Sequence, residues 1–235
     1  MNGRALPLAS IAVVGLLAWA WFVQIGRDMS MHMSMPGMQM GIGALALMWA
    51  VMMAAMMAPS AAPSYLLHAR MSKSALASGA YLAGYLGAWV AVGVAYALAH
   101  WALQRSGLVG AGMRLSSTPF AGVLLIAAGA WQWSPLKGGC VARCRSPLGF
   151  MMNRWRDGAA GAFGMGLRYA GWCVGCCWLV MAVLFVGGAM SFAWAAGISA
   201  YVLAERLLPL GRAFDRAVGV GLAAWGVWLL GAAMP

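Results

Sequence analysis

Sulfur-bearing side chains are concentrated in three short stretches of this chain of 235 residues. The first is "MSMHMSMPGMQM", with six methionines and one histidine in twelve positions. Thioether sulfur suits Cu(I), and imidazole suits copper and zinc. Methionine has no proton to lose, whereas cysteine binds metal as the thiolate. We therefore expect Met31, His32 and Met33 to bind a soft metal; the alternative is adaptable apolar filling at a membrane interface.

The second stretch is "MWAVMMAAMMAPS", which begins at Met48. Residues four apart share one face of a helix, so Met52 and Met56 form one stripe and Met53 and Met57 form an adjacent stripe. These four thioethers could form a ladder that faces a pore or a neighbouring helix. The Met-x-x-x-Met spacing resembles the membrane motif of eukaryotic high-affinity copper transporters. The alternative is ordinary packing, because methionine fills apolar space well.

Cysteine makes up the third group. "CVARCRSP" supplies Cys140 and Cys144, and "GWCVGCCWLVM" supplies Cys173, Cys176 and Cys177. On a helix the last three share one side. They could hold Cu(I) in trigonal geometry, or join Cys140 or Cys144 in the tetrahedral sulfur site that zinc favours. Thiol–disulfide chemistry through the Cys-x-x-Cys pattern is one alternative, and packing as small apolar residues is another.

The composition indicates whether water or lipid surrounds the protein. The chain is 64% hydrophobic and 8% charged, whereas a water-soluble domain carries about 25% charged residues. We therefore expect a lipid bilayer around it. The net charge of +11 concerns membrane orientation rather than nucleic acid, since no soluble basic face remains to meet phosphates. Five cysteines are an odd number, which argues against a framework in which every cysteine is disulfide-bonded.

Seven apolar segments approach the length of about 20 residues that crosses the hydrocarbon core. They are continuously apolar, without the alternation of barrel strands, so they predict helices. We expect an all-α, polytopic membrane helix bundle with about seven spans, or six if the first segment is a signal peptide. The expected spans are Leu6–Ile25, Gly41–Ala58, Ala75–Leu103, Pro119–Trp133, Tyr169–Met190, Phe192–Leu208 and Ala217–Ala233.

Prolines and small residues predict how these helices end and pack. Pro59 and Pro63 are expected to end the second helix, which places His68 in the loop that follows. The third helix repeats small residues every four positions, from Gly79 to Ala99. Such a stripe predicts the face along which a neighbouring helix approaches closely.

Four stretches resemble a known family: "MWAVMMAAMMAPS", "WQWSPLKGGCVARCRSP", "GAFGMGLRYAGWCVGCCW" and the "LVM" that follows. Over about residues 40 to 235 the chain is similar to bacterial integral membrane proteins grouped as domain of unknown function 2182. That family is described as predicted metal-binding membrane proteins and as copper chaperones. The resemblance implies metal ligands among the matching residues, namely Met52, Met53, Met56, Met57, Cys140, Cys144, Cys173, Cys176 and Cys177. The Met-rich loop precedes the shared motifs.

Lysine and arginine predict the orientation. They gather in alternate loops, with six between Lys137 and Arg168, which places the amino terminus in the cytoplasm and the carboxyl terminus in the periplasm. Residues 1–40 then form a first transmembrane helix, or signal, and a Met/His-rich periplasmic loop, and residues 41–235 form a metal-binding helix bundle. Glu205–Arg206 and Asp215–Arg216 are expected to be boundary charges paired with neighbours, with no sign of acid–base catalysis.

The favoured function is copper handling at the bacterial inner membrane, without enzymatic activity. The outer loop would capture Cu(I), thioethers would pass it inward and thiols would hold it, with zinc as the alternative metal at the cysteines. The protein would act as a chaperone, delivery factor or passive conduit for a copper-dependent oxidase or a periplasmic copper protein. A membrane thiol–disulfide oxidoreductase and an accessory subunit without metal are the alternatives. Oligomeric state, direction of movement and native metal stay open.

Overall fold

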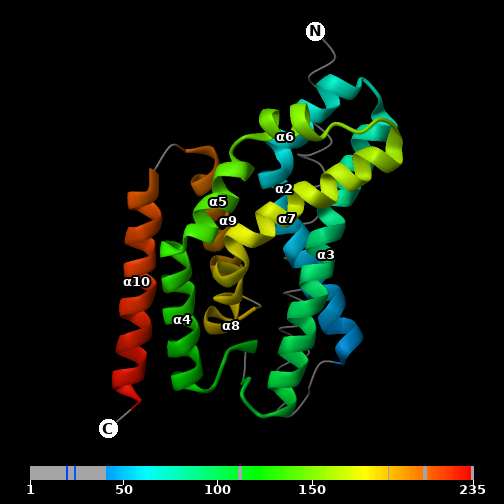
Figure 1. Cartoon of the computed structure of the whole chain (residues 1–235). Coiled ribbons are helices and arrows are strands. Elements are labelled where there is room, and N and C mark those ends of the chain that lie inside the picture. Colours follow the sequence, from blue (N-terminus) through cyan, green and yellow to red (C-terminus); the bar gives the residue numbers. More distant parts are fainter. Residues whose placement is uncertain are drawn as a thin grey trace. The chain divides into compact units, whose positions relative to one another are not determined.

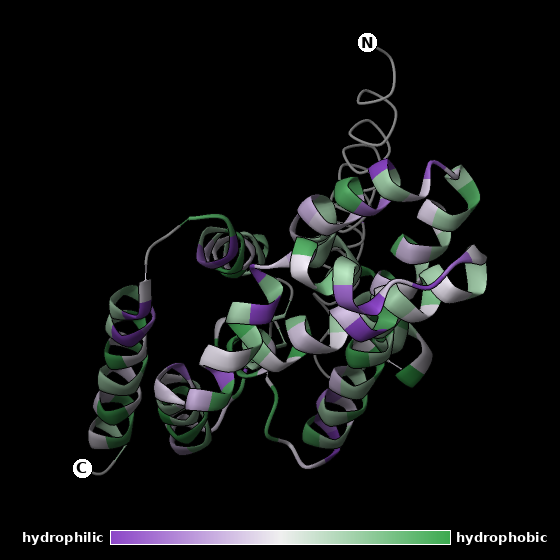
Figure 2. Cartoon of the chain, turned by 45° about the horizontal axis from the view of Figure 1, so that its top comes forward, coloured by the Kyte–Doolittle hydropathy of each residue, from purple (hydrophilic) through white to green (hydrophobic). Residues whose placement is uncertain are grey.

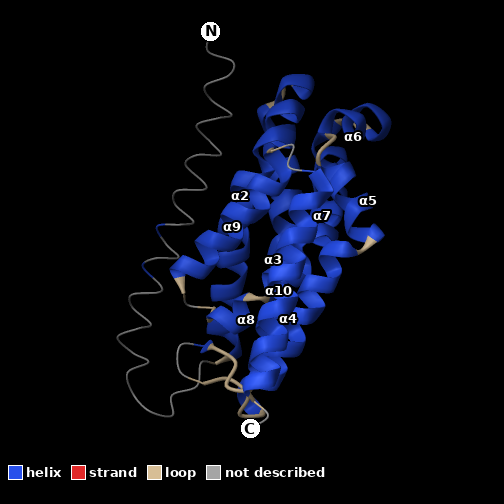
Figure 3. Cartoon of the chain, turned by 90° about the vertical axis from the view of Figure 1, so that its left-hand side faces the viewer, coloured by secondary structure: helices blue, strands red, loops and turns tan. Residues whose placement is uncertain are grey.

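The computed structural model describes residues 41–110, 113–189, 191–208 and 211–233, together with Ala20 and Gln24. This part of the chain consists of helices joined by loops (Figure 3), which confirms the all-α prediction. The helices are α2 (Ile42–Ser72), α3 (Ala75–Arg105), α4 (Thr118–Trp133), α5 (Pro135–Cys144), α6 (Pro147–Arg154), α7 (Gly158–Ala182), α8 (Leu184–Gly187), α9 (Phe192–Leu207) and α10 (Gly211–Ala232). The predicted first span and the loop with Met31, His32 and Met33 lie outside the described residues.

Four helical stretches in the described part are long and apolar enough to cross a membrane: Ile42–Ser72, Ala75–Arg105, Gly158–Gly187 and Gly211–Ala232. On α10 the hydrophilic residues gather at the N-terminal end (Figure 2). Helices α4 and α9 coincide with the fourth and sixth predicted spans, but each has only 16 residues. A straight span needs about 17–25 residues. The expected count of about seven spans is therefore not confirmed.

Helix α2 does not end at Pro59, contrary to the prediction from the sequence; it continues through Pro63 to Ser72. Each proline removes one backbone N–H from the helical ladder. In apolar surroundings the neighbouring backbone groups have no better partner than the helix itself, so the helix continues. The Ser64 hydroxyl donates to the carbonyl oxygen of Ala61 at 2.9 Å, inside this proline-containing stretch. His68 consequently lies within the helix and is buried, rather than in a loop.

The chain forms two compact units, each assembled from two stretches of sequence. Unit 1 comprises Met1–Ala97 and Ala142–Val174, and unit 2 comprises Leu98–Val141 and Gly175–Pro235. Helices α2 and α6 belong to unit 1, whereas α4, α8, α9 and α10 belong to unit 2; α3, α5 and α7 contribute residues to both (Figure 1).

In unit 1, glycines allow close helix packing. A Cβ atom at Gly84 of α3 would lie 2.2 Å from the carbonyl oxygen of Phe163 on α7. A Cβ atom at Gly93 would lie 2.7 Å from the Cα atom of Ala50 on α2. Both distances are below van der Waals contact, so only glycine fits at these two positions. Backbones that approach this closely gain packing contacts where lipid supplies no hydrophobic drive for association.

Among the described residues, the small-residue stripe predicted on α3 is not a packed face. Gly79 and Gly87 are exposed, and a Cβ atom at either would meet nothing within 4 Å. The inward face instead carries Tyr85 and Trp89, both fully buried, beside Gly84. Aromatic side chains bury more surface than glycine or alanine, so their position decides which face turns inward. The stripe predicted from small residues therefore stays open among the described helices.

Substitution of Gly166 tests the packing of unit 1. A Cβ atom at Gly166 of α7 would lie 2.0 Å from the carbonyl oxygen of Tyr81, a backbone atom that cannot rotate away. We expect Gly166→Ala to lower the free energy of unfolding by about 1–3 kcal/mol, the usual cost of overpacking. Gly164→Ala is the matched control, since a Cβ atom there meets nothing within 4 Å. Equal thermal melting of the two variants in detergent would contradict this packing.

In unit 2, α4 and α10 lie side by side (Figure 1) and meet through glycines. A Cβ atom at Gly129 would lie 2.6 Å from the carbonyl oxygen of Gly219, and one at Gly226 would lie 2.6 Å from that of Gly122. The two helices therefore touch backbone to backbone at two levels. This contact fixes the N-terminal end of α10, which carries Asp215, against α4.

Candidate metal centre

Two of the candidate cysteines come together in unit 1. Cys144 is the last residue of α5 and Cys173 lies within α7, and their Sγ atoms are 3.2 Å apart. Both side chains are buried, with exposed fractions of 5% and 0%. All five cysteines lie in the described part of the chain, and all are thiols rather than disulfides. Two sulfurs in contact, away from solvent, can bind a soft metal or undergo oxidation to a disulfide.

Neighbouring aromatic residues position this sulfur pair. The Tyr169 hydroxyl donates a hydrogen bond of 2.5 Å to the carbonyl oxygen of Cys144, and its ring centroid lies 5.4 Å from that of Phe150. The residues that precede the two cysteines also meet: the Arg143 guanidinium lies 4.3 Å from the ring centroid of Trp172. Consecutive residues at the end of α5 thus face consecutive residues of α7. The hydrogen bond of Tyr169 and the contact between Arg143 and Trp172 therefore help the sulfur contact to fix the register between the two segments.

The distance between the two sulfurs can be compared with the needs of a metal. Two thiolates about 2.3 Å from one metal are about 3.8 Å apart in a tetrahedral site and about 4.6 Å apart in a linear two-ligand site, so metal binding would open the pair by about 0.6 to 1.4 Å. A small rotation about a side-chain torsion supplies such a change. Among the residues that the structure describes, no three His, Cys, Asp or Glu side chains form a ready site. Zinc normally takes four ligands, whereas soft Cu(I) accepts fewer, so the pair fits Cu(I) better.

The other three cysteines lie in unit 2. The Sγ atom of Cys140 is 2.8 Å from where a Cβ atom at Gly175 would lie, so this glycine lets α5 approach α7 closely. Arg206 of α9 donates from Nη2 to the Sγ atom of Cys176 at 3.7 Å. Cys177 is fully buried. The structure therefore gives Cys176 a basic neighbour from α9 that the sequence analysis did not anticipate.

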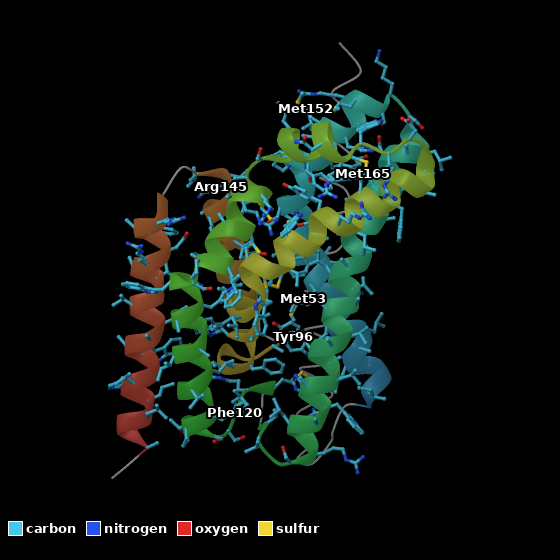
Figure 4. The ribbon with its side chains drawn as sticks, in the orientation of Figure 1. Met53, Tyr96, Phe120, Arg145, Met152 and Met165 are labelled. Atoms are coloured by element: carbon cyan, nitrogen blue, oxygen red, sulfur yellow. The ribbon has the colours of Figure 1, made fainter. Side chains whose placement is uncertain are left out.

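The methionine ladder is buried in unit 1. The exposed fraction is 0% or 1% for every member of the set Met52, Met53, Met56 and Met57. Figure 4 shows Met53 among the helices, whereas Met152 of α6 lies at the surface. The four thioethers therefore turn inward, as both a thioether ladder and dense apolar packing require.

His68 is a buried residue whose place the sequence analysis missed. Its ring lies between those of Tyr81 and Trp155, with centroids at 4.7 and 5.2 Å and nearly parallel planes. Its Nδ1 atom is buried and has no hydrogen-bond partner among the described residues. The continuation of α2 beyond Pro63 puts the imidazole inside unit 1.

A group of charged and polar side chains lies at the core of unit 2. Lys137 of α5 forms an ion pair with Glu205 of α9, and each side chain is 1% exposed. Lys137 also donates to the Gln132 side chain and to the Tyr201 hydroxyl, the latter at 3.2 Å, and lies 4.0 Å from Asp215. We call these five residues the lysine cluster.

The sequence analysis placed Lys137 among loop charges, which was wrong, because Lys137 lies in α5 and is buried. Glu205 lies near the end of α9, at a helix boundary as expected, but it is buried and its ion-pair partner comes from a helix distant in the sequence. An ionisable residue within an apolar segment is costly unless it has a partner. That rule was the available signal: Glu205 stands near the end of an apolar stretch, and Lys137 follows another. Because Lys137 and Glu205 lie far apart in the sequence, their pairing could not be recognised from it.

Comparison with known proteins adds one finding to this geometry. A family model described as PpoB2, copper chaperone, matches residues 46–229. The matched range contains the methionine ladder, all five cysteines and the lysine cluster. No curated protein and no solved structure matches the chain.

Proposed function

Because the chain belongs to the PpoB2 copper chaperone family, we propose that it holds Cu(I) between Cys144 and Cys173. The family match over most of the chain confirms the resemblance drawn from the sequence motifs and supports a copper-related role. The contact between two buried sulfurs, at 3.2 Å, is the observation that carries the choice of site. Thiolate sulfur selects Cu(I) over harder cations.

Binding at this pair releases protons. Two thiols and one Cu(I) ion give a bis-thiolate complex and two protons, so retention of copper weakens as the pH falls. The Tyr169 hydroxyl and the contact between Arg143 and Trp172 keep the two segments in register while the sulfurs separate. Since burial excludes bulk water and oxidants, the reduced metal is protected.

The methionine ladder would deliver copper to the pair, since both lie in unit 1. Thioethers bind Cu(I) without losing a proton and more weakly than thiolates, so ligand exchange would run toward the cysteines. Met31, His32 and Met33 would capture the ion before it reaches the ladder.

The helices long and apolar enough to span a membrane support a membrane location. The resemblance to bacterial integral membrane proteins supports a location in the bacterial inner membrane, crossed several times. The distribution of lysine and arginine supports an amino terminus in the cytoplasm and a carboxyl terminus in the periplasm. A copper-dependent oxidase or a periplasmic copper protein would receive the metal.

Metal analysis tests the proposal. Protein extracted from membranes and loaded with Cu(I) under reducing conditions should retain about one tightly bound copper ion per chain, and much less zinc when the two compete. A membrane protein that lacks the cysteine motifs, loaded and purified in the same way, serves as the control for adventitious copper. Copper no higher than in that control, or a preference for zinc, would exclude the proposed function.

The ladder is tested separately by Met52→Leu together with Met56→Leu. Leucine has a similar volume, so the cost in stability should stay below about 1.5 kcal/mol. We expect the final copper content to be unchanged and the rate of Cu(I) loading, measured by stopped flow, to fall about tenfold because one of the two thioether stripes is gone. Met151→Leu is the control, since Met151 is also fully buried in unit 1. Equal loading rates in the double variant and the control would show that the methionine ladder serves only packing.

The same sulfur contact favours a second candidate, a membrane thiol–disulfide oxidoreductase. Cys144 and Cys173 would then be the redox pair, losing two protons and two electrons to an external acceptor such as a quinone or an oxidised thioredoxin. Thiol alkylation across a series of redox buffers distinguishes the two. A reversible disulfide that cycles with the acceptor in copper-free protein supports this candidate.

A further inference from the structure

A cavity of about 500 Å³ in unit 1 lies where α5, α6 and α7 meet. Its lining consists of Ala142, Arg143, Ser146, Gly149, Phe150, Asn153, Arg154, Arg168 and Trp172. The volume falls within the range of about 300–1,000 Å³ that is usual for small-ligand pockets. Three arginines from three helices converge on it, and neither copper binding nor transfer uses Arg154 or Arg168.

The charged side chains that line this cavity are all basic. None of its lining residues is acidic. Among the described residues of unit 1, Asp157 is the only carboxylate, and its Oδ1 atom accepts a hydrogen bond from Trp155 Nε1 at 2.8 Å. Guanidinium groups that gather at a cavity whose lining holds no carboxylate suit an anionic ligand. Guanidinium groups match the oxygens of phosphate with paired hydrogen bonds.

The polar groups between the arginines suit the same ligand. Ser146 precedes the first turn of α6, yet its side chain makes no capping hydrogen bond to that helix. A Cβ atom at Gly149 would lie 2.8 Å from the Ser146 Oγ atom, so the absence of a side chain there leaves room for the hydroxyl. A hydroxyl of this kind can donate to a phosphate oxygen.

The apolar part of the cavity identifies the source of the phosphate. Phe150 and Trp172 form apolar walls beside the arginines. On α6, Leu148 and Met152 are exposed by 53% and 72%, and Figure 4 shows Met152 on the outer side of the helix. A short helix with exposed apolar side chains and basic residues is typical of the membrane interface. Arg168 and Trp172 belong to the span Gly158–Gly187, so the cavity borders a segment apolar enough for lipid.

We propose that this cavity binds the phosphate of an anionic phospholipid, with Arg154 and Arg168 as its principal ligands and Arg143 as the third. Basic pockets between membrane helices hold the headgroups of anionic lipids through such contacts. The ligand anchors α6 against α7. Arg143 is also stacked on Trp172, so lipid binding at this site adjoins the segment that carries Cys144.

Native mass spectrometry of the full chain tests the site. The wild type should retain cardiolipin or phosphatidylglycerol at least tenfold better than phosphatidylcholine. The double variant Arg154→Gln, Arg168→Gln should lose that preference by at least tenfold. Arg145→Gln with Arg156→Gln is the matched control, because it removes the same charge from exposed arginines of the same region that do not line the cavity. It should stay within twofold of the wild type.

Two further arms complete the experiment. Arg154→Lys with Arg168→Lys keeps the charge but loses the paired hydrogen bonds, and should bind with intermediate strength. Inorganic phosphate and glycerol phosphate, added at millimolar concentration, should not displace the lipid. Displacement by either at micromolar concentration would identify a soluble phosphate as the ligand and overturn the lipid assignment. Equal lipid retention by the two glutamine double variants would overturn the site itself.

Discussion

Replacing both Cys144 and Cys173 with serine is expected to remove about nine-tenths or more of the Cu(I) that the wild-type protein retains. Serine has nearly the size of cysteine, but its hydroxyl oxygen is a hard donor that soft Cu(I) does not select. The two sulfurs are 3.2 Å apart and act on one ion, so their effects are not additive. Each single substitution should therefore cost nearly as much copper as the double substitution. Elemental analysis and competition with a chromogenic Cu(I) chelator measure both effects.

The matched control removes two other thiols, Cys140 and Cys177, which belong to unit 2. We expect Cys140→Ser with Cys177→Ser to keep more than half of the copper. An equal loss in the two double variants would mean that the site needs all the cysteines, as the sequence analysis allowed. Thermal melting of each variant separates loss of metal from loss of fold.

Replacing Lys137 with methionine is expected to produce the largest loss of stability in the chain. The substitution leaves the Glu205 carboxylate, 1% exposed, without its ion-pair partner. Removal of one member of a buried pair costs about 3–5 kcal/mol, which corresponds to a fall in melting temperature on the order of 10 °C. Glu205→Gln should cost less, because Lys137 keeps Asp215 at 4.0 Å. Melting curves in a mild detergent measure the two changes.

Two variants make this prediction specific. Lys137→Met combined with Glu205→Gln should recover at least half of the loss, since neither charge is then stranded. Lys73→Met removes the other lysine of the chain, which is exposed at the end of α2, and should shift the free energy of unfolding by less than about 1 kcal/mol. Similar melting of the two lysine variants would show that the buried ion pair does not stabilise unit 2.

The all-helical fold was predictable from two features of the sequence. So few charged residues indicate a chain in lipid, and apolar runs without the alternation of barrel strands leave helices to pair the backbone groups. The end of α2 was not predictable from the rule that proline stops a helix. That rule assumes that water satisfies the backbone groups which proline leaves behind. In apolar surroundings the helix continues through Pro59 and Pro63, and this continuation buries His68.

The candidate site was predictable only in part. Two groups of cysteines on either side of one charged segment indicated that they meet, and the structure brings Cys144 to Cys173. The contact of Arg206 with Cys176 depends on the position of α9, about which cysteine spacing carries no information. The pairing of Lys137 with Glu205 likewise depends on packing between helices distant in the sequence.

X-ray absorption at the copper edge, recorded on the Cu(I)-loaded protein, tests the central claim most directly. The account predicts a Cu(I) edge and a first shell of sulfur at about 2.3 Å, which disappears in the variant that lacks both Cys144 and Cys173. A first shell of nitrogen or oxygen, or a sulfur shell that survives in that variant, would contradict it.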